Sequence, residues 1–222
     1  MSRPIAVLRP EPGNRVTASA IEAAGRRAIR LPLFAARPLA WTAPDPAEFD
    51  ALILTSANAL RHGGEQLDQL TRLPAYAVGE VTAEAARRGG FDVRVVGDSG
   101  AAALLAGAER AGIRRALHLG GRERTIESGG IVAEAITVYA SETLPIAPES
   151  IARLAGSVSL VQSARAGARL AELVPAQERG QILVMAISAQ AARTVGGGWE
   201  ALHIASGPSS EAMIAAALAL AD

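Results

Sequence analysis

The sequence predicts an α/β protein with parallel sheets, and three observations support this fold class. Half of the 222 residues are hydrophobic, short apolar runs alternate with helix-like segments, and these runs end at small polar residues or glycine. The carboxyl ends of parallel strands share one edge of a sheet and line its ligand crevice. Backbone N–H groups, hydroxyls and helix N-termini at that edge suit a ligand rich in carboxylates or phosphates. The runs are 52–54, 76–78, 117–119, 160–161, 184–187 and 202–204.

The chain begins with a β-α-β pattern. Residues 5–8 are typical of a buried strand, and 14–27 have helical spacing with Asn14 placed to cap the helix. A second strand is expected at 28–33, which makes a parallel sheet the natural arrangement. Residues 31–39 are then too rich in proline for a central strand, so we expect an edge strand or a connector there.

A second series of β-α units runs from residue 51 to about residue 139. The proline-containing tract 141–148 that follows mirrors the earlier connector. Two connectors around a block of one domain's length indicate a domain inserted into another. The strands expected in this block are 51–54, 75–78, 93–96, 116–119 and 131–138, and its helices are one from Asn58, 82–88 and 100–111.

The last third of the chain completes the outer domain. We expect two doubly wound, flavodoxin-like parallel-sheet lobes, the second inserted into the first, joined by a two-stranded β linker with a cleft between the lobes. The alternative is a single continuous doubly wound sheet. The outer elements expected are helices 148–154, 164–173, 189–195 and 209–221, with strands 158–161, 182–186 and 203–205. The expected boundaries are 1–34 with 146–222 for the outer domain, 40–138 for the inserted domain, and 35–39 with 139–145 for the linker strands.

Composition removes several classes of protein. All 22 basic residues are arginine and 22 residues are acidic, so a formal charge of zero argues against nucleic acid as a partner. The absence of lysine excludes Walker-A loops and Schiff-base enzymes, and the absence of cysteine excludes thiolate nucleophiles and disulfide scaffolds. Three scattered histidines predict no metal cluster. No apolar run reaches about 18 residues and the first one is too short for a signal peptide, so we expect a cytoplasmic protein without a membrane partner.

Short strings stand in a consistent order along the whole chain: VLRP at 7–10, LTSANA at 54–59, YAVG at 76–79 followed by Thr82, ITVY at 136–139 ahead of LP at 144–145, AIS at 186–188, and the segment 205–212. In order and spacing this set resembles the uroporphyrinogen-III synthase family. The resemblance implies a lyase of tetrapyrrole biosynthesis that converts hydroxymethylbilane into uroporphyrinogen III, with loss of water and inversion of the last ring. It also implies two lobes around the substrate, no cofactor, a monomer, and a substrate handed over by the preceding deaminase.

The implied chemistry needs little from the protein beyond geometry. Departure of the hydroxyl group gives an azafulvene, which the substituted carbon of the terminal pyrrole attacks to form a spiro intermediate. Holding the chain in that conformation is itself catalytic. A non-catalytic two-lobed protein that closes on an anionic small molecule is the alternative function.

Tyr139 is the candidate catalytic residue. The resemblance implies that the tyrosine at the end of this strand assists loss of the hydroxyl group, and a phenol is protonated at neutral pH and able to donate to a leaving oxygen. The alternative is a tyrosine packed where lobe and linker meet, with its hydroxyl in water.

Hydroxyl and amide residues at the inserted lobe's strand ends are candidates for substrate binding. Thr82, after the turn at Gly79, could bind a propionate or acetate group, or it could be the N-cap of the following helix. Thr55, Ser56 and Asn58 could contact carboxylates, although Ser56 is equally a plausible cap.

The remaining candidates combine arginine, glycine and serine. Gly120 and Gly121 allow close backbone approach, and Arg122 could pair with a carboxylate or stay solvated beside Glu123. Arg9 ends the first strand and could instead brace the linker. The candidates at the outer-lobe tips are Ser163, Ser188 and Ser209.

Overall fold

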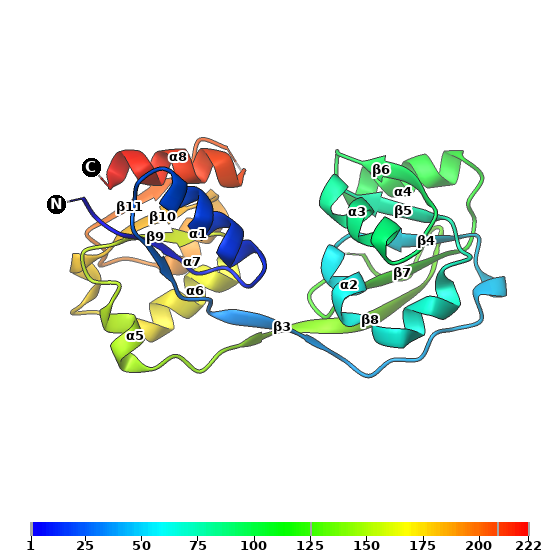
Figure 1. Cartoon of the computed structure of the whole chain (residues 1–222), viewed down its shortest axis with the longest axis horizontal. Helices are drawn as coiled ribbons and strands as arrows, with labels where there is room; N and C mark the ends of the chain where they lie inside the picture. The colour runs from blue at the N-terminus through cyan, green and yellow to red at the C-terminus, as the bar shows by residue number, and fades with distance from the viewer. Residues whose placement is uncertain (1, 125, 208, 222) are drawn as a thin grey trace. The chain divides into compact units, whose positions relative to one another are not determined.

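The computed structural model describes residues 2–124, 126–207 and 209–221. It divides into two compact units, unit 1 from residues 1–35 with 143–222 and unit 2 from residues 36–142 (Figure 1). Each unit has its own sheet. The α/β class with two mostly parallel sheets is therefore confirmed, and the alternative of one continuous sheet is wrong.

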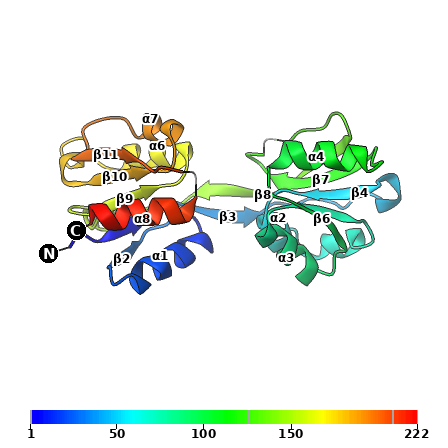
Figure 2. The ribbon, with the colours of Figure 1, turned by 90° about the horizontal axis from the view of Figure 1, so that it is seen from above.

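Unit 1 contains a parallel five-stranded sheet in the order β11-β10-β9-β1-β2. If the five strands are numbered in chain order and read from β2 to β11, the sheet order is 2-1-3-4-5, which is the flavodoxin-like order. The direction in which successive strands are added reverses between β1 and β9. Figure 2 shows β11, β10 and β9 next to one another, with β2 farther along. The strands are β1 (Ile5–Val7), β2 (Ala28–Arg30), β9 (Val158–Val161), β10 (Leu183–Ala186) and β11 (Ala201–Ile204).

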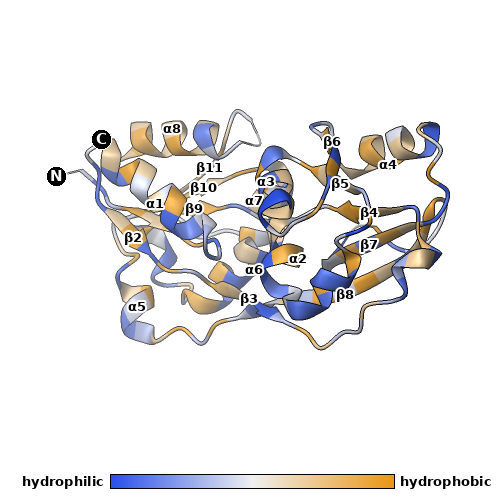
Figure 3. Ribbon diagram, turned by 45° about the vertical axis from the view of Figure 1, so that its right-hand side comes forward, coloured by the Kyte–Doolittle hydropathy of each residue, from blue (hydrophilic) through white to orange (hydrophobic). Residues whose placement is uncertain are grey.

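Helices cover both faces of this sheet because its strands are apolar on both sides. Leu160 and Met185 pack with α1 and α8, whereas Val161 and Val184 pack with α5, α6 and α7. Figure 3 shows α8 as almost wholly hydrophobic. The helices are α1 (Gly13–Ala23), α5 (Pro148–Ala152), α6 (Ala164–Leu173), α7 (Ala189–Val195) and α8 (Ser210–Leu220).

The two ends of the chain meet in unit 1. The Arg3 backbone N–H donates to the Ala221 carbonyl oxygen at 2.9 Å. The Arg3 guanidinium also forms two hydrogen bonds of 2.7 Å with the Glu200 carboxylate. The first and last described segments of the chain thus belong to one folded body.

The turn from β1 into α1 differs from the expected one. Pro12 occupies the N-cap position and makes no side-chain cap bond, so the prediction of Asn14 as the cap is wrong. The Asn14 side chain is completely buried, and its amide donates to the Val7 and Arg9 carbonyl oxygens at 2.7 and 3.0 Å. Asn14 therefore holds the strand-to-helix turn from inside the helix.

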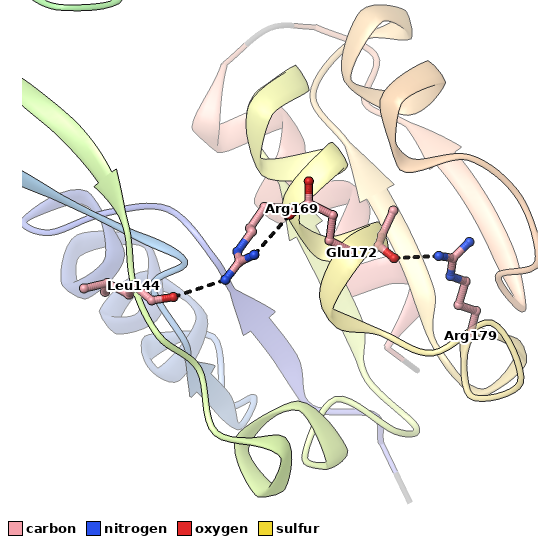
Figure 4. A network of polar contacts seen from close by, with 5 residues as sticks. Leu144, Arg169, Glu172 and Arg179 are labelled. Atoms are coloured by element: carbon pink, nitrogen blue, oxygen red, sulfur yellow. Dashed lines mark hydrogen bonds and ion pairs between the residues drawn. The ribbon is translucent and has the colours of Figure 1, made fainter.

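Arginines organise the end of α6 (Figure 4). Arg169 donates to the Leu144 carbonyl oxygen at 3.4 Å and pairs with Glu172 at 3.0 Å. Arg179 donates to the Ala171 carbonyl oxygen at 2.6 Å. Arginine side chains near a helix C-terminus satisfy carbonyl groups that have no partner within the helix.

Unit 2 contains a six-stranded sheet in the order β3-β8-β7-β4-β5-β6. From β4 onward the strands appear in the order 3-2-1-4-5, a second common doubly wound arrangement, and the direction of winding reverses between β4 and β7. The strands are β3 (Phe34–Pro38), β4 (Ala51–Leu54), β5 (Ala75–Val78), β6 (Val93–Gly97), β7 (Ala116–Gly121) and β8 (Val132–Thr143). Since β8 continues to Thr143, Tyr139 lies inside this strand and not at its end.

The unit 2 sheet is also covered on both faces. Leu52, Leu54 and Leu117 pack with α2 and α3, whereas Ile53 packs with α4 on the opposite side. The helices are α2 (Ala57–His62), α3 (Glu80–Arg88) and α4 (Ala101–Arg110), and the 3-10 turns of the two units are η1 (Pro46–Glu48), η2 (Gly64–Leu70) and η3 (Arg179–Gln181). Among the described residues, no helix combines the length and apolarity needed to cross a membrane.

Candidate active site

A pocket of about 410 Å³ lies at the carboxyl edge of the unit 2 sheet. The reversal between β4 and β7 places it at the topological switch point, where open α/β sheets bind ligands. Its walls come from the ends of β4, β5 and β7, the first residues of α2 and α4, and the inner part of β8. The lining residues are Thr55, Ser56, Asn58, Val78, Ala101, Gly121, Glu123, Arg124, Tyr139 and Ser141.

Five of the predicted residues meet in this pocket: Thr55, Ser56, Asn58, Gly121 and Tyr139. Thr55, Ser56 and Asn58 come after β4, Gly121 ends β7, and Tyr139 lies in β8. These three strands are adjacent in the sheet, in the order β8-β7-β4. The parallel-edge argument from the sequence is sufficient for the four that follow or end β4 and β7, whereas Tyr139 reaches the pocket from inside β8.

Tyr139 stands against Gly121. The pairing of β7 with β8 shifts by one residue after Gly120, so that Gly121 pairs with Tyr139. A Cβ on residue 121 would lie 2.7 Å from Cζ and 3.0 Å from the hydroxyl oxygen of Tyr139. Glycine at 121 therefore provides the space that the phenol occupies. The His62 ring lies beside it, with 6.0 Å between the ring centroids.

Thr55 has a partner that sequence reasoning missed. Its Oγ1 lies 3.2 Å from Nε2 of His118, a completely buried residue of β7. Burial, and secondarily the charge of Arg124, lower the pKa of His118 to about 4. The ring is therefore neutral at physiological pH. The sequence signal that could have identified His118 is a histidine inside the otherwise apolar run 116–119.

Ser56 and Asn58 begin α2. The Ser56 hydroxyl accepts from the Asn58 backbone N–H at 3.2 Å, so the expected N-cap is present. The Asn58 side-chain oxygen accepts from Arg61 at 3.0 Å. A capping hydroxyl keeps its own hydrogen, which it can donate to a ligand.

Arg124 is the arginine that lines this pocket, and the predicted Arg122 is not among the lining residues. The Arg124 side chain is 15% exposed and pairs with Glu127 at 2.9 Å, while its other terminal nitrogen donates to the Thr137 hydroxyl. The Arg122 side chain is exposed, and its backbone N–H donates to the Tyr139 carbonyl oxygen at 2.9 Å.

Gly79 and Thr82 lie at the start of α3, outside the pocket lining. Gly79 is the N-cap with φ of 77°, a conformation that glycine adopts without strain. The prediction of Thr82 as an alternative N-cap is wrong, because it follows Gly79 by three residues, inside the first turn. Its side chain is only 5% exposed.

Gly120 does not line the pocket, but it lies against His118 and Arg124. A Cβ on residue 120 would lie 2.9 Å from Cε1 of His118 and 3.2 Å from Cδ of Arg124. The φ of Gly120 is not in the positive region, so the constraint is one of space.

In unit 1, the three predicted serines share one structural role. Each accepts a hydrogen bond from the backbone N–H three residues later and so caps the following helix. The pairs are Ser163 with Ala166 at 3.1 Å, Ser188 with Ala191 at 3.2 Å, and Ser209 with Ala212 at 3.1 Å.

Arg9 also belongs to the strand edge of unit 1. Its guanidinium lies 3.2 Å from the Ser210 hydroxyl, in the first turn of α8. Across the parts of the chain that the structure describes, no three histidine, cysteine or acidic residues are grouped so as to hold a metal ion.

The fold and the pocket define a two-unit α/β protein with a pocket at the switch point of the unit 2 sheet. A family model described as uroporphyrinogen-III synthase HemD matches residues 15–215, and the chain belongs to this family. It is accordingly a lyase-type enzyme of tetrapyrrole biosynthesis, with hydroxymethylbilane as the substrate that the family implies. The resemblance drawn from the short strings is confirmed.

Solved structures show the same fold. A uroporphyrinogen-III synthetase from Helicobacter pylori is 19% identical with a TM-score of 0.67, over 99% of this chain and 100% of that one. A mutant uroporphyrinogen III synthase from the extremely thermophilic bacterium Thermus thermophilus is 15% identical with a TM-score of 0.50, over 97% of each chain. No curated protein matches the sequence.

Proposed function

We propose that the unit 2 pocket takes the hydroxymethyl end of hydroxymethylbilane and that Tyr139 assists loss of its hydroxyl group on the way to uroporphyrinogen III. The observation that carries this proposal is the position of the phenol in the pocket wall, beside Gly121 and among hydroxyl and guanidinium donors. A phenol in that position can act as a general acid.

Loss of the hydroxyl group is proposed to proceed with Tyr139 as the acid. The bond between the hydroxymethyl carbon and its oxygen breaks, and the pyrrole nitrogen supplies the electron pair. The Tyr139 proton goes to the departing oxygen, which leaves as water. The pyrrole N–H then returns a proton to the phenolate, leaving an azafulvene.

Attack by the substituted carbon of the last pyrrole on the azafulvene carbon forms the spiro intermediate, and the N–H proton of the last pyrrole passes to the azafulvene nitrogen. The bond between the substituted carbon and its original bridge carbon then breaks, which leaves a second azafulvene on the neighbouring ring and returns that ring's N–H proton to the last pyrrole. The free α-carbon of the last pyrrole attacks the released bridge carbon and gives up its hydrogen as a proton to the second azafulvene nitrogen, so that the ring is inverted.

Substrate carboxylates are proposed to bind to donors of the strand edges. In the pocket, Arg124 is positioned for a charged pair, which is stronger than a neutral hydrogen bond. Thr55, Ser56 and Asn58 add neutral donors. Outside the lining, Gly79, Thr82, Gly120 and Arg122 are proposed to contribute backbone or peripheral contacts in unit 2. Arg9, Ser163, Ser188 and Ser209 are proposed as donors in unit 1.

The finer features of the enzyme's setting belong to the same proposal. We propose a cytoplasmic monomer that receives hydroxymethylbilane from the deaminase that makes it. Direct transfer would limit spontaneous closure of the free chain. Adding an inactive deaminase variant should then slow delivery of substrate to the synthase, and no change in rate would contradict transfer.

The decisive measurement is isomer analysis. Freshly made hydroxymethylbilane is given to the purified protein, and the products are oxidised and separated into type I and type III porphyrins. We expect type III to predominate. Type I alone, at the spontaneous rate, would exclude synthase activity and leave the binding-protein alternative.

Tyr139→Phe tests the catalytic assignment. Loss of the phenolic proton should lower kcat roughly hundredfold to ten-thousandfold, while stability should change by only about 1 kcal/mol. Tyr76→Phe is the matched control, because Tyr76 is buried on β5 of the same unit and does not line the pocket. Equal rates for wild type and Tyr139→Phe would remove Tyr139 from the mechanism.

A further inference from the structure

We propose that His118 is a positioning residue, whose Nε2–H donates to Thr55 Oγ1 and so frees the Thr55 hydroxyl hydrogen for an acceptor in the pocket. Its consequence for catalysis rests on the proposed function of that pocket. The hydrogen-bond direction itself can be tested without substrate.

The geometry joins a buried residue to a pocket residue. His118 pairs with Ile53 in the register of β7 and β4, and Thr55 is the first residue after β4. The Nε2 to Oγ1 distance of 3.2 Å spans the two strands at the edge of the pocket. Thr55 lines the pocket and His118 does not, so the hydrogen bond to Thr55 is the contact through which His118 can position a ligand.

The surroundings of the ring decide which nitrogen carries the proton. Burial keeps the ring neutral, so one nitrogen is a donor and the other an acceptor. Within the described part of the chain, Nδ1 is buried and has no hydrogen-bond partner. A buried N–H without a partner is rarer in proteins than an unsatisfied acceptor. The Ile126 backbone raises the pKa and favours the opposite tautomer, but forms no hydrogen bond of normal geometry with Nδ1. The proton is therefore assigned to Nε2.

This direction determines what Thr55 offers to a ligand. A hydroxyl has one hydrogen to donate. If Nε2 were the acceptor, that hydrogen would be used inside the protein and only lone pairs would face the pocket. With Nε2 as the donor, the hydrogen is available for a carboxylate or a leaving oxygen, and donation from His118 polarises the hydroxyl further.

The absence of a side chain at Gly120 leaves room for the His118 ring in this orientation. The space at residue 120 is filled by the edge of the imidazole, since a Cβ there would come within 2.9 Å of Cε1 and 3.2 Å of Nε2. The predicted glycine thus serves the pocket indirectly, through the histidine.

The first experiment determines the tautomer. The full chain is labelled with ¹⁵N-histidine, and two-bond ¹⁵N–¹H correlations are recorded at neutral pH. His118→Gln identifies the His118 signals among the three histidines. A protonated Nε2 with unprotonated Nδ1 is expected. A protonated Nδ1 would overturn the proposal, whether or not the protein makes type III product.

The second experiment is a double-mutant cycle on kinetics. Thr55→Val should raise KM for hydroxymethylbilane roughly tenfold with little change in kcat, as expected for loss of a hydrogen bond to a charged group. His118→Leu should raise KM by a smaller factor, because Thr55 keeps its hydroxyl hydrogen but loses the donor that orients and polarises the hydroxyl. The double variant should be no worse than Thr55→Val alone. A purely structural role for His118 would instead make the two effects multiply, and that result would overturn the proposal.

Two further variants separate positioning from folding. His118→Gln keeps an amide N–H in the side chain and should recover part of the lost affinity. His203→Gln, on β11 of unit 1, is the matched histidine control and should leave KM unchanged. The wild-type isomer analysis tests the proposed function separately. Type III product together with independent effects of Thr55 and His118 would therefore refute only the positioning role.

Discussion

Arg124 brings the only positive side chain among the described lining residues to the unit 2 pocket. The carboxylate of Glu127 and the hydroxyl of Thr137 hold its guanidinium on two sides. A side chain that is already ordered loses less conformational entropy when it binds a ligand. The exposed side chain of Arg122 would have to be ordered by the substrate.

Exchanging each arginine for glutamine measures this difference. Arg124→Gln should raise KM for hydroxymethylbilane roughly tenfold, because a charge-assisted hydrogen bond is lost. Arg122→Gln is the matched variant and should change KM by less than about threefold. Thermal unfolding of both variants checks that the Thr137 and Glu127 contacts of Arg124 do not account for the loss. A larger effect at Arg122 would relocate the carboxylate site.

At the scale of elements, an irregularity between β7 and β8 shapes the pocket. The register shifts between Gly120 and Gly121, so β8 has one residue more than β7 at that point. Bulges of this kind bend a strand and redirect side chains, and they occur often beside active sites. Val138 and Tyr139 consequently both contact the same hydrophobic cluster, although they are neighbours in a strand.

Gly121→Ala tests the steric fit at this bulge. The added methyl group would meet the Tyr139 ring, so we expect a loss of about 1–3 kcal/mol of unfolding free energy and a lower kcat. Gly107→Ala, inside α4 where the nearest atom to the new Cβ is an Arg110 side-chain nitrogen at 3.9 Å, should instead raise stability by about 0.5–1 kcal/mol. Denaturant unfolding and turnover are measured for both. A fully active Gly121→Ala enzyme would show that the ring has room to move.

The pattern of elements was largely predictable from sequence, because apolar runs and the small residues after them mark strand ends directly. The same rule predicted the pocket residues that follow strands, such as Thr55 and Ser56. It could not find His118, which contacts a residue of a neighbouring strand, or the length of β8, whose last three residues are polar. It also misassigned Asn14 and Thr82, because a polar residue inside the first turn has the same local pattern as a cap.

At the scale of the whole molecule, each unit has hydrophobic clusters of its own. Two lie in unit 1 and two in unit 2. Leu170 and Leu117 are completely buried members of one cluster in each unit. Cores that are separate in this way allow the units to differ in local stability.

Leu170→Ala and Leu117→Ala should each cost about 2–5 kcal/mol through loss of buried surface and creation of a cavity. Hydrogen exchange with mass spectrometry should show reduced protection mainly in the unit that carries the substitution. The positions along the chain at which the loss of protection ends would also test the proposed linker strands 35–39 and 139–145. Equal loss of protection in both units would contradict separate cores.

The closure of unit 1 by both ends of the chain has a consequence for synthesis on the ribosome. β1 pairs with β9, whose first residue is Val158, so the earliest strand must wait while all of unit 2 is translated. At about 5–20 residues per second, this delay is on the order of ten seconds. During it, β1 can pair with β2 but lacks β9, its partner on the other side. The nascent chain is therefore expected to need chaperone cover over β1 until β9 has been made and the Arg3 backbone N–H can donate to Ala221.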